Sequence, residues 1–212
     1  MNLHLDWCSA KAATYATKKW HYTGTTGTPP QVRVGAWERG AFVGVVLFAR
    51  GANKNIGRPY GLEQIECCEL VRVALSDSHE SPTSRIVSRS IRLLKGKEPK
   101  LRLVVSYADK NQDHEGVIYQ AMNWIYTGET SSSYMYKWKD GNFYHQREVS
   151  ATGKKPYYGQ LRIVPKINEC EKIPQLGKHK YLYPLDKAIR RQVEALSKPY
   201  PKHANVGEME SR

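Results

Sequence analysis

A carboxylate stands at the end of the best candidate for a buried strand in this chain. The apolar run Leu101–Ser106 predicts that strand, and Ser106-Tyr107-Ala108-Asp109 completes it. Open α/β sheets place ligand-binding groups at the carboxyl ends of their strands, so Asp109 is a candidate base or metal ligand. A carboxylate at this position can equally cap a turn or the next helix, and the sequence leaves both roles open.

A second group with chemical potential is His21-Tyr22, directly before a loop rich in Thr, Gly and Pro that runs to Pro30. Histidine titrates near neutral pH and ligates metals, although a lone loop histidine is often only solvated. Together with Asp109, these residues would give a histidine, phenol and carboxylate set that suits iron. We therefore expect Tyr22 and Asp109 to share one cleft. His114 and His145 are further candidates of the same kind.

The segment between Leu75 and Ser84 leads into a predicted helix. A helix N-terminus offers free N–H groups and partial positive charge, which suits the pyrophosphate of coenzyme A. The hydroxyls of Ser81, Thr83 and Ser84 would add donors. Ordinary helix capping, with Ser81 as cap and Pro82 at the first position, explains the same residues.

The charge of the chain is strongly positive, with 33 Lys and Arg against 20 Asp and Glu. Residues 147–212 hold 14 basic and 7 acidic residues, so the excess is densest in the last third. Such an excess points to a polyanionic partner, usually nucleic acid. A solvated helix face is the alternative for an arginine stripe, and some of the tyrosines among the basic residues would be core. The candidate phosphate contacts are Arg85, Arg89, Arg92, Lys154, Lys155, Arg190 and Arg191.

The order of predicted elements favours one mixed α/β sheet flanked by helices, because strand and helix alternate in the middle of the chain. Ser9 is expected to cap the first helix, and Asp140-Gly141 to turn a hairpin. An edge strand is expected near Lys180–Leu185. The predicted helices cover residues 10–20, 84–95, 115–126 and 186–198, and the predicted strands 32–37, 41–48, 69–75, 101–106, 134–139 and 143–147.

We expect a catalytic domain over residues 1–150, a basic extension packed on it over 151–200, and a disordered tail over 201–212. The four cysteines form no CxxC pair, which favours reduced thiols. The absence of an apolar stretch of membrane-spanning length and of a secretory signal favours a cytoplasmic protein with no membrane partner.

Several of these motifs in combination resemble the phage Mom family. The resemblance covers roughly residues 5–150 and rests on Trp20-His21-Tyr22-Thr23-Gly24, Val43-Gly44-Val45-Val46, Glu69-Leu70-Val71-Arg72, Ser106-Tyr107-Ala108-Asp109, His114-Glu115-Gly116, Ile118-Tyr119-Gln120-Ala121 and Asp140-Gly141. It implies a GNAT-like acyltransferase fold and conversion of adenine in phage DNA to N6-(methylcarbamoyl)adenine, which protects the DNA from restriction. The C-terminal Lys180–Asp186 segment is also similar to the end of related phage proteins.

The same resemblance implies site residues and ligands. His21, Tyr22, Asp109 and Tyr119 match positions linked to catalysis, the first three also to iron, and Arg72 and Ser84 match positions near an acyl-CoA site. The glycine-rich RxxGxG/A loop of ordinary GNAT enzymes is absent. The implied partners are double-stranded DNA and acetyl-CoA or another acyl donor, and a homodimer is left open. Two alternatives stay open: a conventional N-acetyltransferase acting on a small amine or protein, and a non-enzymatic DNA-binding protein.

Overall fold

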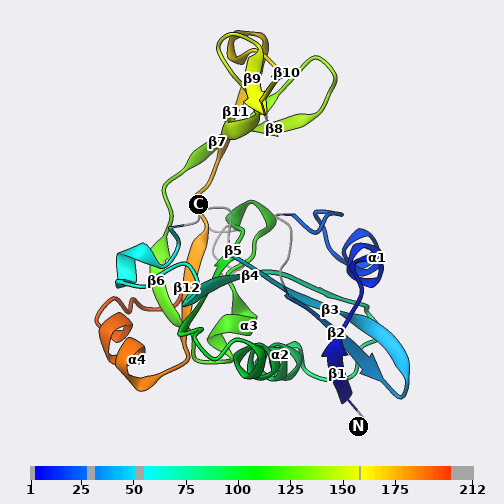
Figure 1. The fold of residues 1–212 in the computed structure, drawn as a ribbon, viewed down its shortest axis with the longest axis vertical. Coiled ribbons are helices and arrows are strands. Elements are labelled where there is room, and N and C mark those ends of the chain that lie inside the picture. Colours follow the sequence, from blue (N-terminus) through cyan, green and yellow to red (C-terminus); the bar gives the residue numbers. More distant parts are fainter. Residues whose placement is uncertain (1–2, 28–31, 51–54, 158, 202–212) are drawn as a thin grey trace, which may run out of the picture. The chain divides into compact units, whose positions relative to one another are not determined.

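The computed structural model describes residues 3–27, 32–50, 55–157 and 159–201, and it divides into two compact units (Figure 1). The first, here called the core unit, comprises residues 1–108, 115–128 and 179–212. The second, here called the insert, comprises residues 109–114 and 129–178. The domain boundary predicted between residues 150 and 151 falls inside the insert, and the predicted tail lies outside the described residues from 202 onward.

A seven-stranded sheet organises the core unit, in the order β1-β2-β3-β4-β5-β12-β6. Strands β4 and β5 are parallel, whereas the pairs β1–β2, β2–β3, β3–β4 and β5–β12 are antiparallel. The predicted fold class, a mixed central sheet flanked by helices, is confirmed. Its strands are β1 (Leu3–Trp7), β2 (Val32–Glu38), β3 (Ala41–Ala49), β4 (Cys67–Leu75), β5 (Leu103–Ala108), β6 (Ile125–Glu129) and β12 (His179–Pro184).

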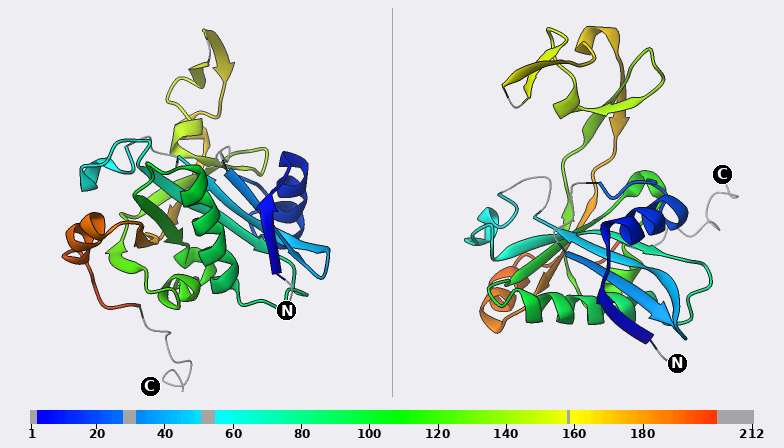
Figure 2. Two further views of the ribbon diagram at one scale, coloured as in Figure 1. Left: turned by 60° about the horizontal axis from the view of Figure 1, so that its bottom comes forward. Right: turned by 45° about the vertical axis from the view of Figure 1, so that its right-hand side comes forward.

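Helices cover both faces of this sheet (Figures 1 and 2). Alternating residues of one strand point to opposite faces, and Cys68 packs in the cluster of α2 and α3 while its neighbour Cys67 packs in that of α4. In the same way Val46 faces α2, whereas Val45 packs with α1. The helices are α1 (Ala10–Trp20), α2 (Thr83–Lys97), α3 (Val117–Gln120) and α4 (Lys187–Glu194), with short 3-10 turns η1 (Arg58–Tyr60), η2 (Lys110–Gln112), η3 (Gln146–Glu148) and η4 (Ile167–Glu169).

Elements with strong local signals form as predicted. The hydroxyl of Ser9 accepts the N–H of Ala12 at 3.1 Å and caps α1. The hairpin of β2 and β3 turns at Arg39 and Gly40, both with positive φ. At α2 the cap position is Pro82 rather than Ser81, and no side chain caps the helix. No helix among the described residues has the length and apolar character that crossing a membrane would require.

The predicted helix over residues 115–126 is wrong. Only α3 is helical there, and the segment ends as strand β6. Asn123 adopts a left-handed conformation with φ of 54°, which a continuing helix does not accommodate. The predicted edge strand near Lys180 is a central strand instead, because β12 lies between β5 and β6.

The insert connects β6 to β12 and consists mainly of short strands. The predicted hairpin around Asp140-Gly141 is present as β7 and β8. Buried hydrophobic side chains are few in its described part, with Tyr136 and Val149 among them, so backbone pairing supplies much of its order. Its strands are β7 (Ser133–Lys137), β8 (Phe143–His145) and β11 (Glu171–Gln175) in one sheet, and β9 (Lys154–Tyr157) and β10 (Gln160–Ile163) in another.

Candidate functional site

The parallel strands β4 and β5 separate before they end. Their pairing runs from Cys67 and Leu103 to Leu70 and Ser106, although β4 continues to Leu75 and β5 to Ala108. The register of β3 on β4 also shifts at this point, since Leu47 faces Arg72 and Phe48 faces Leu70. The bulge and the separation leave backbone groups of β4 beyond Leu70 unpaired on the β5 side, at the carboxyl end of both strands.

A buried hydroxyl pair fills the point where the two strands separate. The Ser106 hydroxyl lies 2.8 Å from the carbonyl oxygen of Leu70 and 2.8 Å from the phenol oxygen of Tyr119. Tyr119 comes from α3 and is 7% exposed, and burial raises its pKa to about 12. It is therefore a neutral phenol at physiological pH, suited to donating a hydrogen bond rather than to acting as a base.

Glu69 supplies a carboxylate on β4, one residue before the last position at which the two strands pair. After burial, the charge of Glu69 raises the pKa of Tyr107, and it also contributes to the raised pKa of Tyr119. By strand alternation, Glu69 lies on the same face of the sheet as Cys67 and Tyr107, whereas Tyr119 packs on the opposite face. Glu69 is half-buried on β4. The sequence analysis assigned it no role, although an acidic residue inside an apolar strand is the signal that could have found it.

Lys180 adds a cation on the neighbouring strand. It pairs with Tyr107 across β12 and β5, and its ammonium nitrogen lies 5.1 Å from the centre of the Tyr60 ring. Burial lowers the pKa of Lys180. Sequence reasoning also missed this residue, because its position beside β5 depends on a strand that returns only after the insert.

The predicted residues His21 and Tyr22 lie in the loop that follows α1. The Nδ1 atom of His21 is 2.9 Å from the hydroxyl of Thr23, and its ring stacks on Tyr22 with centroids 4.6 Å apart. Tyr22 is 52% exposed, yet it contributes to the raised pKa of Tyr119. The convergence of Tyr22 with Tyr119 and the other predicted site residues stays a prediction.

Arg72 fixes this loop to β4. Its Nε donates to the carbonyl of Thr25 at 3.2 Å, and its Nη1 donates to the carbonyl of Val71 at 2.6 Å. Gly27 has φ of +70°, and a Cβ atom there would lie 2.6 Å from Nη2 of Arg72. In the described residues, Arg72 thus orders the loop that carries Tyr22.

Asp109 belongs to the insert, where it supports local structure. One carboxylate oxygen accepts the backbone and side-chain N–H groups of Asn111 at 3.1 and 3.0 Å, and the other pairs with Lys178 at 2.8 Å. Burial raises the pKa of Asp109, but the hydrogen bonds from Lys178 and Asn111 outweigh it and lower the pKa overall. The predicted catalytic role of Asp109, and its convergence with Tyr22, stay predictions.

The residues do not support the predicted iron site. Within the described ranges, no three His, Cys, Asp or Glu side chains gather closely enough to hold a metal ion. His21 directs Nδ1 to Thr23, and both oxygens of Asp109 already have partners.

The turn before α2 already holds a carboxylate of the chain itself. The buried carboxylate of Glu38 accepts the backbone N–H groups of Glu80 and Ser81 at 2.6 and 2.8 Å. Although burial raises the pKa of Glu38, these hydrogen bonds lower it overall, so the group is ionised. An anion therefore already occupies the N–H groups of Glu80 and Ser81, and the use of the N-terminus of α2 by a pyrophosphate stays a prediction. The hydroxyl-bearing Ser84 lies in the first turn of α2.

The predicted DNA contacts lie in three separate places. Arg85, Arg89 and Arg92 are exposed on α2, opposite its buried face, and Arg89 donates to the carbonyl of Leu3 at 3.2 Å. Arg190 and Arg191 lie on α4 in the core unit, and Lys154 and Lys155 lie on β9 in the insert. Their contacts with DNA stay predictions.

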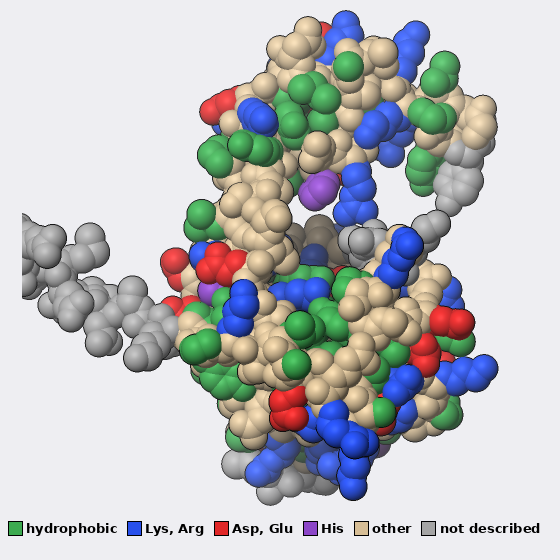
Figure 3. All heavy atoms as spheres, turned by 90° about the vertical axis from the view of Figure 1, so that its left-hand side faces the viewer, with side chains coloured by type: hydrophobic (Ala, Val, Ile, Leu, Met, Phe, Trp, Pro, Cys, Tyr) green, Lys and Arg blue, Asp and Glu red, His purple; other side chains and the backbone are tan. Residues whose placement is uncertain are grey.

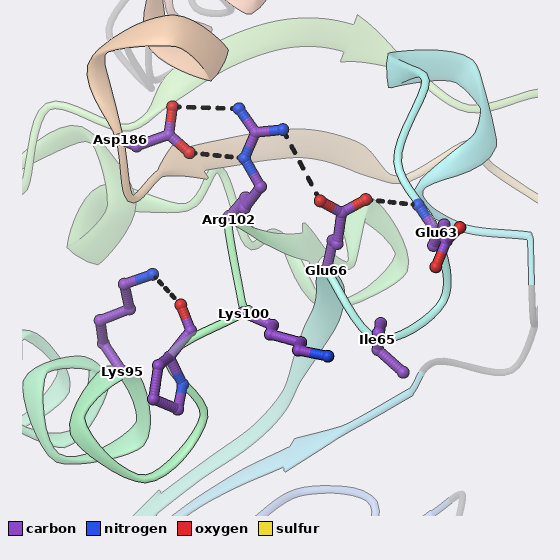
Figure 4. A pocket seen from close by; sticks show the side chains of 8 residues that line it. Glu63, Ile65, Glu66, Lys95, Lys100, Arg102 and Asp186 are labelled. Carbon is purple, nitrogen blue, oxygen red and sulfur yellow. Dashed lines mark hydrogen bonds and ion pairs between the residues drawn. The ribbon is translucent and has the colours of Figure 1, made fainter.

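A pocket of about 530 Å³ lies at the other end of β4 and β5 (Figure 4). Its centre is paired internally: Arg102 donates to Asp186 at 2.8 Å and lies 3.6 Å from Glu66. Asp186 also caps α4. This pocket therefore holds a structural network rather than the site. It is lined by Glu63, Ile65, Glu66, Lys95, Pro99, Lys100, Arg102 and Asp186.

Comparison with known proteins identifies a family. A model of the Mom protein family matches residues 2–202. The methylcarbamoylase mom of Escherichia phage Mu is 27% identical over 189 residues, which cover 86% of this chain and 76% of that protein. Among solved structures, the putative acetyltransferase yncA from Salmonella typhimurium, with acetyl-CoA, aligns over 88% of this chain and 96% of its own at 12% identity and a TM-score of 0.48. A Bacillus subtilis acetyltransferase in complex with CoA aligns over 87% and 100%, at 11% identity and a TM-score of 0.45.

Proposed function

The chain belongs to the Mom protein family, and from this premise we propose that it is a transferase that converts adenine in double-stranded DNA to N6-(methylcarbamoyl)adenine. The phage Mu relative is a methylcarbamoylase, which supports the transferred group. The modified DNA would resist host restriction, and the protein would act in the host cytoplasm.

The observation that carries this proposal is the group of polar side chains where β4 and β5 separate. Tyr119 is a buried neutral phenol held by Ser106, and the charge of Glu69 acts on it. An adenine N6 amine is a weak nucleophile, so its attack needs a base for the departing proton and a donor for developing negative charge. We assign the first task to Glu69 and the second to Tyr119, whose phenol proton would turn from Ser106 to the developing charge.

In the proposed step, N6 forms a bond to the transferred carbon while the bond from that carbon to the donor's leaving group breaks. Glu69 accepts the proton that N6 loses. The reacting amine lies within the base stack of a duplex, so the adenine must flip out. Tyr22 is exposed and offers its ring for stacking on the flipped base, with His21 stacked behind it.

We assign the donor to the acyl class, with the transferred carbonyl already bearing the methylamino group, and place its arm along the unpaired edge of β4, where backbone groups can pair with an amide-bearing chain. Arg72 would position the loop over this arm, and Ser84 would line the approach from α2. Asp109 keeps its proposed catalytic role from the family resemblance. Because Glu38 occupies the turn before α2, a diphosphate in the donor would bind elsewhere.

The test is nucleoside analysis of DNA from cells that express the protein. We expect an adenosine heavier by a methylcarbamoyl group and DNA that resists restriction enzymes. Glu69→Gln should abolish both, whereas the exposed carboxylate variant Glu63→Gln, at the opposite end of the strand, should change neither. Unmodified adenine in the wild-type experiment would refute the proposed reaction, and full modification by Glu69→Gln would remove Glu69 from it.

A further inference from the structure

The hairpin of β9 and β10 in the insert exposes nearly all of its side chains. Seven of its eight strand residues are exposed, among them Tyr157 at 58%, Leu161 at 71% and Ile163 at 80%. A two-stranded hairpin without a buried face is marginally stable alone. Figure 3 shows basic and hydrophobic side chains gathered over the insert, at the top of the view. Such a surface indicates a partner.

The two faces of the hairpin differ in chemistry. Lys155 pairs directly with Arg162, and Tyr157 with Gln160. Because residues two apart in a strand share a face, these four side chains form one polar face. The opposite face carries Lys154 and Pro156 against Ile163 and Leu161.

The polar face concentrates positive charge that the hairpin does not neutralise. Lys155 and Arg162 are like charges directly across from each other, an arrangement that costs stability unless an anion intervenes. The sequence has no Asp or Glu between Glu148 and Glu169, although it has four Lys or Arg residues there. Arg162 lies over the Tyr157 ring, 5.9 Å from its centre. An anionic partner would relieve the repulsion.

We infer that this face of the hairpin, formed by Lys155, Tyr157, Gln160 and Arg162, binds double-stranded DNA by entering its major groove. A two-stranded antiparallel ribbon fits the width of that groove. Arg and Lys pair with phosphates, and Arg and Gln also recognise base edges there. The inference rests on the proposed function, since an enzyme that modifies adenine in DNA must hold the duplex.

Three variants of the full chain test the surface. Binding of a fluorescent unmodified 20-base-pair duplex is measured by anisotropy, without donor, over a series of salt concentrations. Arg162→Gln should weaken binding about three- to tenfold and lower the slope of log affinity against log salt by about 1. The double variant Lys155→Gln/Arg162→Gln should lower this slope further. Lys137→Gln removes the same charge from β7 of the insert, where Glu171 lies directly across, and should leave the slope unchanged.

An unchanged slope for Arg162→Gln, or an equal change for Lys137→Gln, would overturn the inference. A second result would also overturn it: sedimentation shows that the wild type is a dimer, the double variant Leu161→Ser/Ile163→Ser is a monomer, and Arg162→Gln binds DNA normally. The hairpin would then serve self-association. The binding assay does not depend on catalysis, so the two proposals can fail independently. If nucleoside analysis finds no modified adenine, the proposed reaction fails, and the binding assay still measures the contribution of the hairpin to DNA binding.

Discussion

The hydroxyl oxygen of Ser106 lies 2.8 Å from the phenol oxygen of Tyr119, at the last paired position of β4 and β5. Since Ser106 also lies 2.8 Å from the Leu70 carbonyl, it ties the phenol to the backbone of β4. The phenol oxygen therefore has a fixed position where the two strands separate. Because the Ser106 hydrogen goes to the Leu70 carbonyl, the phenol donates to Ser106, and only its proton must turn to meet a developing negative charge.

Removing the phenol oxygen should reduce activity more than stability. We expect Tyr119→Phe to lower the rate of adenine modification by about 10²- to 10³-fold, the usual cost of losing one fixed hydrogen-bond donor. The variant keeps the ring and should unfold with a free energy lower by about 1–2 kcal/mol. Quantified nucleosides and urea denaturation measure the two effects.

The matched control is Tyr126→Phe, which removes another buried phenol, 2.9 Å from His179. This variant should lose a similar free energy of unfolding to Tyr119→Phe, while its rate of adenine modification stays unchanged. Equal loss of activity in both variants would show that Tyr119 acts only through packing.

Alanine variants of two glycines in one loop distinguish the effect of backbone strain from the effect of contact with Arg72. Gly27 and Gly24 both have positive φ, of +70° and +63°, so alanine strains the backbone at either position by about 1 kcal/mol. Only at Gly27 would the new Cβ meet Arg72, since nothing lies within 4 Å at Gly24. We expect Gly27→Ala to displace the loop that carries Tyr22 and to lower modification about tenfold more than Gly24→Ala. Equal activities would contradict a positioning role for Arg72.

Local signals predicted much of the fold. The Ser9 cap and the turn at Arg39 and Gly40 are encoded within a few residues, so α1 and the β2–β3 hairpin followed from the sequence. The stretch after Glu115 has helical spacing, but the left-handed Asn123 ends the helix and turns the chain into β6. Tertiary pairing with β12 outweighs helix propensity there.

The candidate site was harder to predict because it depends on distant strands. Tyr22 and Tyr119 were candidates from their motifs, and their joint role in one site stays a prediction. Glu69 and Lys180 were not, since their proximity to Tyr107 requires that β4 and β12 flank β5. The order of strands across an insert of this length is a long-range property that periodicity does not reveal.

The Glu38 carboxylate should stabilise the turn before α2. Glu38→Ala leaves the N–H groups of Glu80 and Ser81 without their buried acceptor, so we expect the free energy of unfolding to fall by about 2–4 kcal/mol. Glu80→Ala removes only a surface ion pair with Arg39 and should cost about 0–1 kcal/mol. Urea denaturation compares the variants. Similar small losses would mean that the turn is not held by Glu38, and would reopen it to a diphosphate.

The ion pair of Arg102 and Asp186 should make stability depend on pH in the acidic range (Figure 4). The hydrogen bond from Arg102, partly opposed by burial, lowers the pKa of Asp186 from 3.8 to about 2. A depressed folded-state pKa means that the stabilisation is complete above the unfolded value and is lost as pH falls through the folded value. Because Asp186 is 33% exposed, solvent screening reduces this contribution to about 1 kcal/mol.

Asp186→Asn tests this contribution while retaining a side chain that can cap α4. At pH 7 the variant should unfold with a free energy about 1 kcal/mol below that of the wild type. The difference should shrink between pH 4 and pH 2, because the wild-type carboxylate becomes neutral across the interval from 3.8 to about 2. Asp77→Asn, an exposed carboxylate outside the network, should show no such convergence. A difference that stays constant to pH 2 would assign the effect to the cap of α4 rather than to the charge pair.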